Sequence, residues 1–238
     1  MTKSKGRGGK KPHGKQKTHP KTSKRLTKAE RRGDPVLRDR HTYTPPKTLN
    51  IDQLESHDPT RPFTTLPCQI CETANCGDHG SPIVVDIRSK SKFPAACAIF
   101  FRAASAYNKT FLLHDVKTNR RRIDLTTAIT ALKQLCDLRL ARPKKNAPPS
   151  KPVDQVVIKT NSKWLVNHFT ARTFSQDSGF HNLQLEFKAA VAELTSLNGG
   201  RPVVVKFWRF GQPTMARELA DVAFNGWEEA KAHFEVEE

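Results

Sequence analysis

Long apolar stretches are missing from this sequence of 238 residues. No run of about 18 apolar residues occurs, which excludes a membrane-spanning helix of ordinary length. The first residues, MTKSKGRGGKK, have no apolar core, so we expect no secretory signal there. Cysteine is also scarce. Because five cysteines occur without an export signal, we expect a reducing compartment and thiols or metal ligands rather than disulfides.

Acidic and aliphatic side chains are scarce in residues 1–40. This segment has 15 Lys and Arg against 3 Asp and Glu, so it carries +12 of the net charge of +18. A segment that cannot bury a core is expected to be disordered. Blocks of like charge are typical of a nuclear or nucleolar address or of an arm that binds nucleic acid, and a merely solubilising tail is the alternative. We therefore expect a nuclear or nucleolar location, or otherwise a cytoplasmic one.

Regular apolar patterning is also absent from residues 41–66. This segment contains four prolines and is predicted to be a linker, so that residues 1–66 form a tail and linker. A cysteine- and histidine-rich turn follows at residues 67–81. Cys68, Cys71, Cys76 and His79 supply four zinc ligands within twelve residues, and a closed set of four would hold a structural Zn²⁺. Incidental thiols in a loop are the alternative.

Residues 82–234 carry apolar patterns typical of both strands and helices. The strand patterns cover Ile83–Ile87, Ala95–Phe101, Thr110–Val116, Val156–Ile158 and Val203–Trp208, and the helical patterns cover Leu125–Cys136, a short segment capped by Asn161 and Ser162, Leu183–Leu197 and a last segment from about Thr214. Three early strands without an intervening helix predict an antiparallel meander, and the later β-α-β connections predict parallel pairs. The order βββ-α-β-α-α-β-α therefore predicts an α/β domain with a mixed five-stranded sheet. Cys97 and Cys136 fall on apolar patterns and are predicted to be core residues.

Three acids take similar positions within these elements. Asp86 interrupts the most apolar strand, Asp124 opens the first helix, and Asp221 lies in the first half of the last helix. Each also has a plain explanation: a strand end in contact with solvent for Asp86, a favourable charge at a helix N-terminus for Asp124, and an exposed helix face for Asp221. A functional role depends on the three converging.

Four segments in this order resemble the ribonuclease H (RNase H) family over about residues 82–227. IVVD resembles the family's first strand with its metal-binding Asp, and RRRIDLTTAITALKQL resembles its first long helix, with Asp124 in place of Glu. VVIKTNSKWLVN resembles the segment that carries the third acid, with Asn161 in place of Asp. VVVKFWRF followed by RELADVA resembles the last strand and helix, with Asp221 as the fourth acid. The cysteine and histidine cluster upstream is similar to that of fungal members.

The resemblance implies a two-metal hydrolysis of the RNA strand of an RNA–DNA hybrid. Asp86, Asp124 and Asp221 would bind Mg²⁺ or Mn²⁺, and Asn161 would complete the catalytic set with a neutral amide oxygen. One unit of negative charge is then lost beside the metals. In a rival alignment Arg217 takes the place of the fourth acid, but Asp221 fits better because Glu218 and the Ala-Asp pair then match.

Two further family features are absent. The glycine-rich turn after the first Asp is replaced by Ile87-Arg88-Ser89-Lys90, and the loop RFGQPTMA before the last helix has no His. Two hypotheses therefore stand: an RNase H-type endonuclease with an impaired carboxylate set, or a noncatalytic protein of the same fold that binds nucleic acid or a protein partner.

Basic residues near the expected cleft are candidate contacts for phosphates. They are Arg88, Lys90, Arg120, Arg121, Arg122 and Lys163. Solvated loops are the alternative for these charges. We expect a monomer whose partner is an RNA–DNA hybrid or RNA and which has no contact with a membrane.

Overall fold

The computed structural model describes residues 41–45, 54–56, 61–67, 82–114, 119–140, 153–170, 179–212 and 214–236, with the side chains of 170 and 230–236 excepted. The predicted disorder of residues 1–40 and the predicted zinc ligands Cys68, Cys71, Cys76 and His79 lie outside the described residues.

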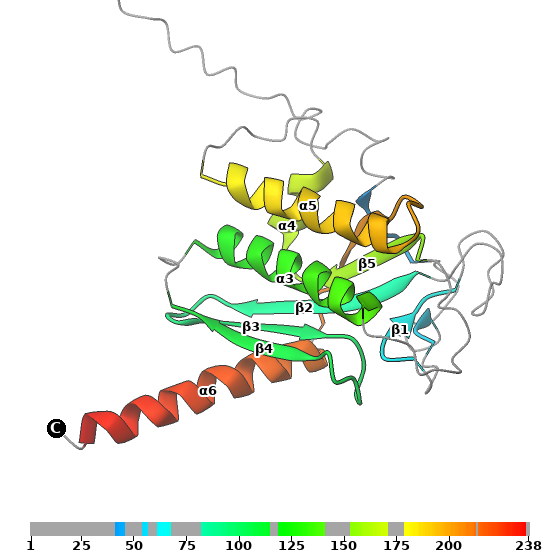
Figure 1. Ribbon diagram of the computed structural model, residues 1–238. Helices are drawn as coiled ribbons and strands as arrows, with labels where there is room; N and C mark the ends of the chain where they lie inside the picture. The colour runs from blue at the N-terminus through cyan, green and yellow to red at the C-terminus, as the bar shows by residue number, and fades with distance from the viewer. Residues whose placement is uncertain are drawn as a thin grey trace, which may run out of the picture.

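The described chain forms an α/β fold (Figure 1). Its strands are β1 (Thr64–Thr65), β2 (Ile83–Lys90), β3 (Ala95–Phe100), β4 (Lys109–Leu113), β5 (Gln155–Thr160) and β6 (Val204–Arg209), and its helices are α3 (Arg120–Leu140), α4 (Lys163–Thr170), α5 (His181–Leu197) and α6 (Met215–Val236). The five predicted strands and four predicted helices are confirmed. β1 was not predicted, since two residues carry no periodicity.

The sheet is mixed and has the strand order β4-β3-β2-β5-β6, with β1 paired to β2 off this path. β2, β3 and β4 form the predicted antiparallel meander, and β2, β5 and β6 run parallel to one another. β2 therefore lies at the centre, where the antiparallel and parallel halves of the sheet meet.

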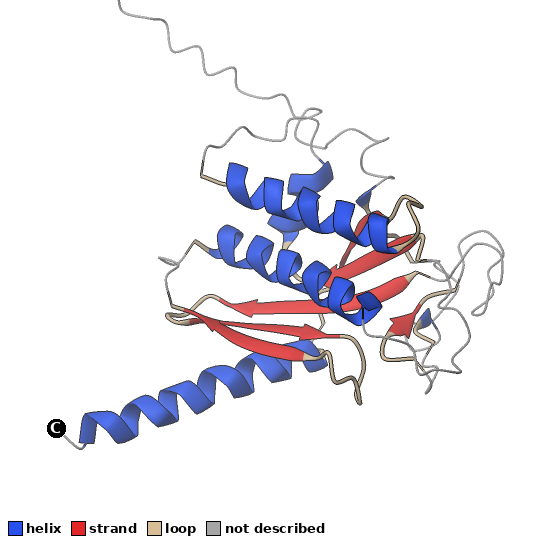
Figure 2. Cartoon of the chain, in the orientation of Figure 1, coloured by secondary structure: helices blue, strands red, loops and turns tan. Residues whose placement is uncertain are grey.

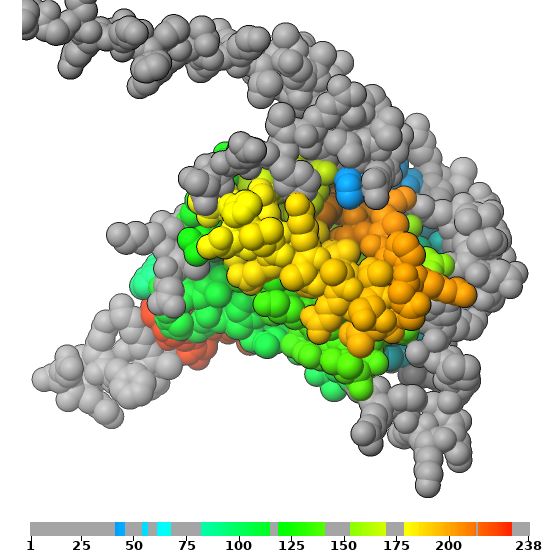
Figure 3. Space-filling view, turned by 45° about the horizontal axis from the view of Figure 1, so that its top comes forward, coloured from blue at the N-terminus to red at the C-terminus, as the bar shows by residue number. Residues whose placement is uncertain are grey.

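Helices cover both faces of the sheet (Figure 2). α3 and α5 pack together on one face, and the space-filling view shows α5 lying over α3 (Figure 3). α6 crosses the opposite face against β2, β3 and β4. Side chains alternate along β2, so Ile83, Val85 and Ile87 join the core beneath α3, while Asp86 and Arg88 face the side of α6.

Local chemistry sets the ends of two helices. The hydroxyl of Ser162 accepts a hydrogen bond of 3.2 Å from the backbone N–H of Leu165, which confirms the predicted cap of α4. α5 ends before Gly199 and Gly200, whose φ angles of 71° and 78° suit glycine.

The described residues between 41 and 67 pack on the sheet rather than hanging free as a linker. Tyr43, Leu54 and Leu66 are buried with Trp208 in a second apolar cluster. The N–H of Tyr43 donates to the carbonyl of Phe207 at 3.0 Å, beside the outer edge of β6. Three isolated apolar residues among prolines show no periodicity, so the sequence did not indicate that each fills a place in the core.

No helix among the described residues combines the length and apolar character needed to cross a membrane.

Candidate functional site

A pocket forms where β2 extends further than its parallel neighbour β5. The last pair between these strands is Ile87 with Thr160, whereas β2 continues to Lys90 beside β3. The next positions, Arg88 on β2 and Asn161 after β5, therefore lie level with each other. In open α/β sheets, ligands bind at this end, outside the carboxyl ends of the parallel strands.

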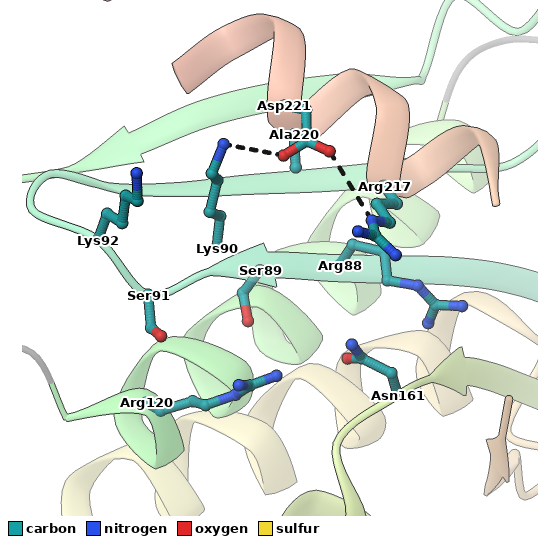
Figure 4. Close-up of a pocket in the computed structure, with 10 residues that line it drawn as sticks. All are labelled: Arg88, Ser89, Lys90, Ser91, Lys92, Arg120, Asn161, Arg217, Ala220 and Asp221. Atoms are coloured by element: carbon teal, nitrogen blue, oxygen red, sulfur yellow. Dashed lines mark ion pairs between the residues drawn. The ribbon is translucent and has the colours of Figure 1, made fainter. Parts of the chain in front are cut away.

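The pocket has a volume of about 390 Å³, within the usual range for ligand sites. It is lined by Arg88, Ser89, Lys90, Ser91, Lys92, Arg120, Asn161, Arg217, Ala220 and Asp221. These residues come from β2 and the turn after it, from the N-terminal ends of α3 and α6, and from the segment between β5 and α4 (Figure 4). Five of the lining side chains are cationic and one is a carboxylate, so the pocket is strongly basic.

The single carboxylate lies between two of these cations. Asp221 Oδ1 is 3.0 Å from Lys90 Nζ, and its Oδ2 is 3.8 Å from Arg217 Nε (Figure 4). Lys90 Nζ also lies 4.4 Å from the ring centroid of the buried Phe224, and Lys92 Nζ lies 5.2 Å from it. The ring face of Phe224 thus helps to hold both lysines beside the pocket.

Arg88 lines the pocket, but its guanidinium is used inside the protein. Only 4% of the residue is exposed, and Nη1 lies 3.2 Å from Asp86 Oδ1. Nη2 donates to the carbonyls of Phe210 and Gln212, each at 3.4 Å. Arg88 therefore ties β2 to the segment that leads into α6, and its buried guanidinium is already engaged in these contacts.

Asp86 lies beneath the pocket rather than in it. It pairs with Lys159 of β5, two positions before Asn161, and 5% of it is exposed. Burial raises the pKa of Asp86 to about 6, and the charge of Arg88 and the hydroxyl of Thr214 offset this only partly.

Asp124 lies on the other face of the sheet from Asp86. α3 begins at Arg120, so Asp124 stands in its second turn. The sequence predicted that Asp124 opens this helix, and the helix instead begins four residues earlier. Asp124 is 5% exposed and accepts a short hydrogen bond from the hydroxyl of Ser89. This bond fixes the first turns of α3 against the end of β2.

Of the four residues predicted to be catalytic, the structure brings two into the pocket, Asn161 and Asp221. Asp86 and Asp124 are buried on opposite faces of β2. Among the described residues, no three His, Cys, Asp or Glu side chains lie close enough together to hold a metal ion.

The comparisons with known proteins do not decide the family. No family model matches this sequence, and no curated protein does so either. The resemblance to RNase H rests on the order of motifs alone.

The other predicted basic contacts are not among the residues that line the pocket. Arg121, Arg122 and Lys163 are exposed near the N-terminal ends of α3 and α4. The guanidinium carbon of Arg121 lies 5.9 Å from the ring centroid of Trp164, which also stacks on His168 at 4.6 Å. Trp164 itself is half-buried and packs against the edge of the main core.

Sequence reasoning missed Lys92 and Arg217 as contacts, together with the hydroxyls of Ser89 and Ser91. A signal was present: Arg88, Lys90 and Lys92 alternate with serines, which at the period of a strand gathers cations on one face. Arg217 was seen only as a departure from a family motif, and its place beside Lys90 depends on how α6 crosses the sheet.

The two described cysteines belong to the core, as predicted. Cys97 is 0% and Cys136 2% exposed. Burial raises the pKa of both thiols to about 11, so neither is a nucleophile at neutral pH.

Proposed function

We propose that this protein binds nucleic acid through an RNase H-like α/β domain and does not cleave it. The observation that carries the proposal is the charge of the pocket. Where the resemblance implies acidic metal ligands, the lining has five cations, the neutral Asn161 and the single carboxylate of Asp221. Such a lining suits phosphates, whereas Mg²⁺ and Mn²⁺ prefer charged oxygens.

The fold and the charge of the whole chain support the same proposal. An antiparallel meander followed by parallel β-α-β units is the arrangement that the resemblance implies. The net charge of +18 favours a polyanionic partner. Exposed Arg121, Arg122 and Lys163 extend the basic surface beyond the pocket.

Hydrolysis of the RNA strand of an RNA–DNA hybrid is the second candidate function. Its specific support is that Asn161 and Asp221 line one pocket. It requires that Asp86 or Asp124 leave its buried contact to reach a metal ion there.

Binding is tested by fluorescence anisotropy with labelled single-stranded RNA, single-stranded DNA and an RNA–DNA hybrid at two salt concentrations. We expect the wild type to bind with a strong salt dependence and the double variant Arg120→Gln/Arg217→Gln to bind more weakly with a smaller salt slope. Arg201→Gln, compared with each of the two single variants, is the control for loss of one positive charge, because Arg201 is exposed just before β6, at the other end of the parallel strands. Absence of binding by the wild type to every probe at low salt contradicts the proposal.

Cleavage is tested on the hybrid with Mg²⁺ and then Mn²⁺. We expect no cleavage by the wild type, and a gain of activity in Asn161→Asp would show that the missing charge is the defect. Robust cleavage by the wild type that Asp86→Ala abolishes would overturn the noncatalytic assignment and favour the second candidate.

A further inference from the structure

Asp221 takes the place in the pocket that an anionic ligand would take. Its two carboxylate oxygens face two cations from different elements, Lys90 of β2 and Arg217 of α6. A phosphate group offers the same arrangement of anionic oxygens to cations, with one more charge when it is doubly ionised.

The contacts that hold Asp221 are weak enough for a ligand to replace. The side chains of Asp221 and Arg217 are 42% and 62% exposed, and exposed ion pairs contribute little to stability. Arg217 also precedes Asp221 by four residues in α6, and a base that precedes an acid at this spacing is the less favourable order in a helix.

Two more cations face the same space without a carboxylate of their own. In the described part of the chain, no carboxylate lies within ion-pair distance of Lys92 or Arg120. Figure 4 shows Arg120 reaching from the start of α3 toward the side of the pocket where Asn161 lies. Asp86 and Asp221 together carry two negative charges, whereas the pocket lining carries five positive charges. The pocket therefore keeps an excess of positive charge.

The start of α3 adds an energetic reason for an anion at this place. Its first turn has Arg120, Arg121 and Arg122 and no acid. Cations at a helix N-terminus are unfavourable, because the unpaired N–H groups there already carry partial positive charge. An anion bound in the pocket would relieve this repulsion.

We propose that the pocket binds a phosphate group of a nucleic-acid strand, and that Asp221 is an internal anion which competes with this phosphate for Lys90 and Arg217. The inference rests on the proposed function and assigns the contacts within it. It assigns Asp221 a role opposite in sign to that of a metal ligand: removal of its charge strengthens binding.

The test is the affinity of the full-length Asp221→Asn variant for a short labelled single-stranded oligonucleotide in the presence of a chelator. We expect affinity to rise about two- to fivefold, the size of one partly exposed charge interaction. Glu218→Gln is the matched control, because Glu218 is an exposed acid of the same helix outside the pocket lining. It changes the net charge equally, so the gain in Asp221→Asn must exceed the gain in Glu218→Gln.

Arg120→Gln gives the opposite change. We expect affinity to fall about two- to fivefold and the salt slope for single-stranded probes to fall by about 0.7, the value for one lost phosphate contact. Equal affinities of Asp221→Asn and Glu218→Gln would overturn the inference. A parallel titration without chelator gives the other contrary result. The inference is overturned if wild-type binding there requires Mg²⁺ or Mn²⁺ and Asp221→Asn binds more weakly, because Asp221 would then be a metal ligand.

A second probe separates failure of the inference from failure of the proposed function. If no oligonucleotide binds the wild type, the proposed function fails, and inorganic pyrophosphate at constant ionic strength then tests the pocket by thermal shift. We expect pyrophosphate to raise the Tm of the wild type more than that of Arg120→Gln, and an equal shift overturns the inference. If oligonucleotides bind but neither pocket variant differs from its control, the proposed function stands and the inference fails.

Discussion

Asp86 shows how one neighbour changes the role of a carboxylate. In the sequence, an acid inside an apolar strand suggested a metal ligand. In the structure, Asp86 and Arg88 share a face of β2, since they are two residues apart in a strand, and they form a buried ion pair. The alternation was visible in the sequence. What it could not show was that α6 and the segment before it cover that face and exclude water from the pair.

Stability should depend on pH through Asp86. Because the pKa is raised from 3.8 to about 6, the folded state retains this proton when the unfolded state has lost it. The contribution of Asp86 to the free energy of unfolding is therefore greatest below pH 3.8 and decreases as the pH rises through 6. The decrease is up to about 3 kcal/mol, and it should be absent from Asp86→Asn.

The measurement is urea unfolding of the wild type and Asp86→Asn across this pH range. The change of their difference with pH is the readout, since the variant also leaves Arg88 without its counter-ion at every pH. Asp137→Asn, at an exposed position of α3, is the control for loss of one negative charge. A difference between wild type and Asp86→Asn that stays constant with pH would contradict the prediction.

The helices and strands were predictable because each carries its own pattern. α3 shows the helical period from Ile123 to Cys136, and the strands appear as short apolar runs bounded by polar turns. The residues that line the pocket come from four separate segments, and no local pattern shows that these segments meet. Only the register of β2 with β5 shows that Arg88, and not Asp86, lies level with Asn161.

Asn198 joins the end of α5 to the start of β5. Its side-chain oxygen accepts from the N–H of Val153 at 2.7 Å, and its amide donates to the carbonyl of Val153 at 3.0 Å. Asn198 and Val153 are both buried. Replacement of the side chain therefore leaves two buried backbone groups without their partner.

We expect Asn198→Ala to lower the free energy of unfolding by about 2 kcal/mol, the cost of unsatisfied buried polar groups. Asn225→Ala is the matched control on the exposed face of α6, and it should change stability by no more than about 0.5 kcal/mol. Equal midpoints of the two variants in urea would show that water or a rearranged loop satisfies Val153.

Basic charge is concentrated in two regions of the chain. Residues 1–40 carry +12, and the pocket concentrates cations from four segments at one end of the sheet. The described residues between 41 and 67 belong structurally to the folded domain, because Tyr43, Leu54 and Leu66 are buried in it. These three residues share the second apolar cluster with Val84 of β2 and Trp208 of β6.

Removal of residues 1–40 should therefore separate binding from stability. The shortened chain keeps every described contact, so its urea midpoint should match that of the full chain, while its affinity for nucleic acid and its salt slope should both fall.

Tyr43→Ala should lower the urea midpoint and leave the affinity for nucleic acid unchanged. The ring of Tyr43 packs 5.5 Å from that of Trp208 in the second apolar cluster, and loss of a buried aromatic side chain costs about 3 kcal/mol. Tryptophan fluorescence in urea and anisotropy with one labelled oligonucleotide measure both properties on both proteins. A lower midpoint for the shortened chain would place residues 1–40 in the fold, and unchanged affinity would leave the pocket and its rim as the main contact with nucleic acid.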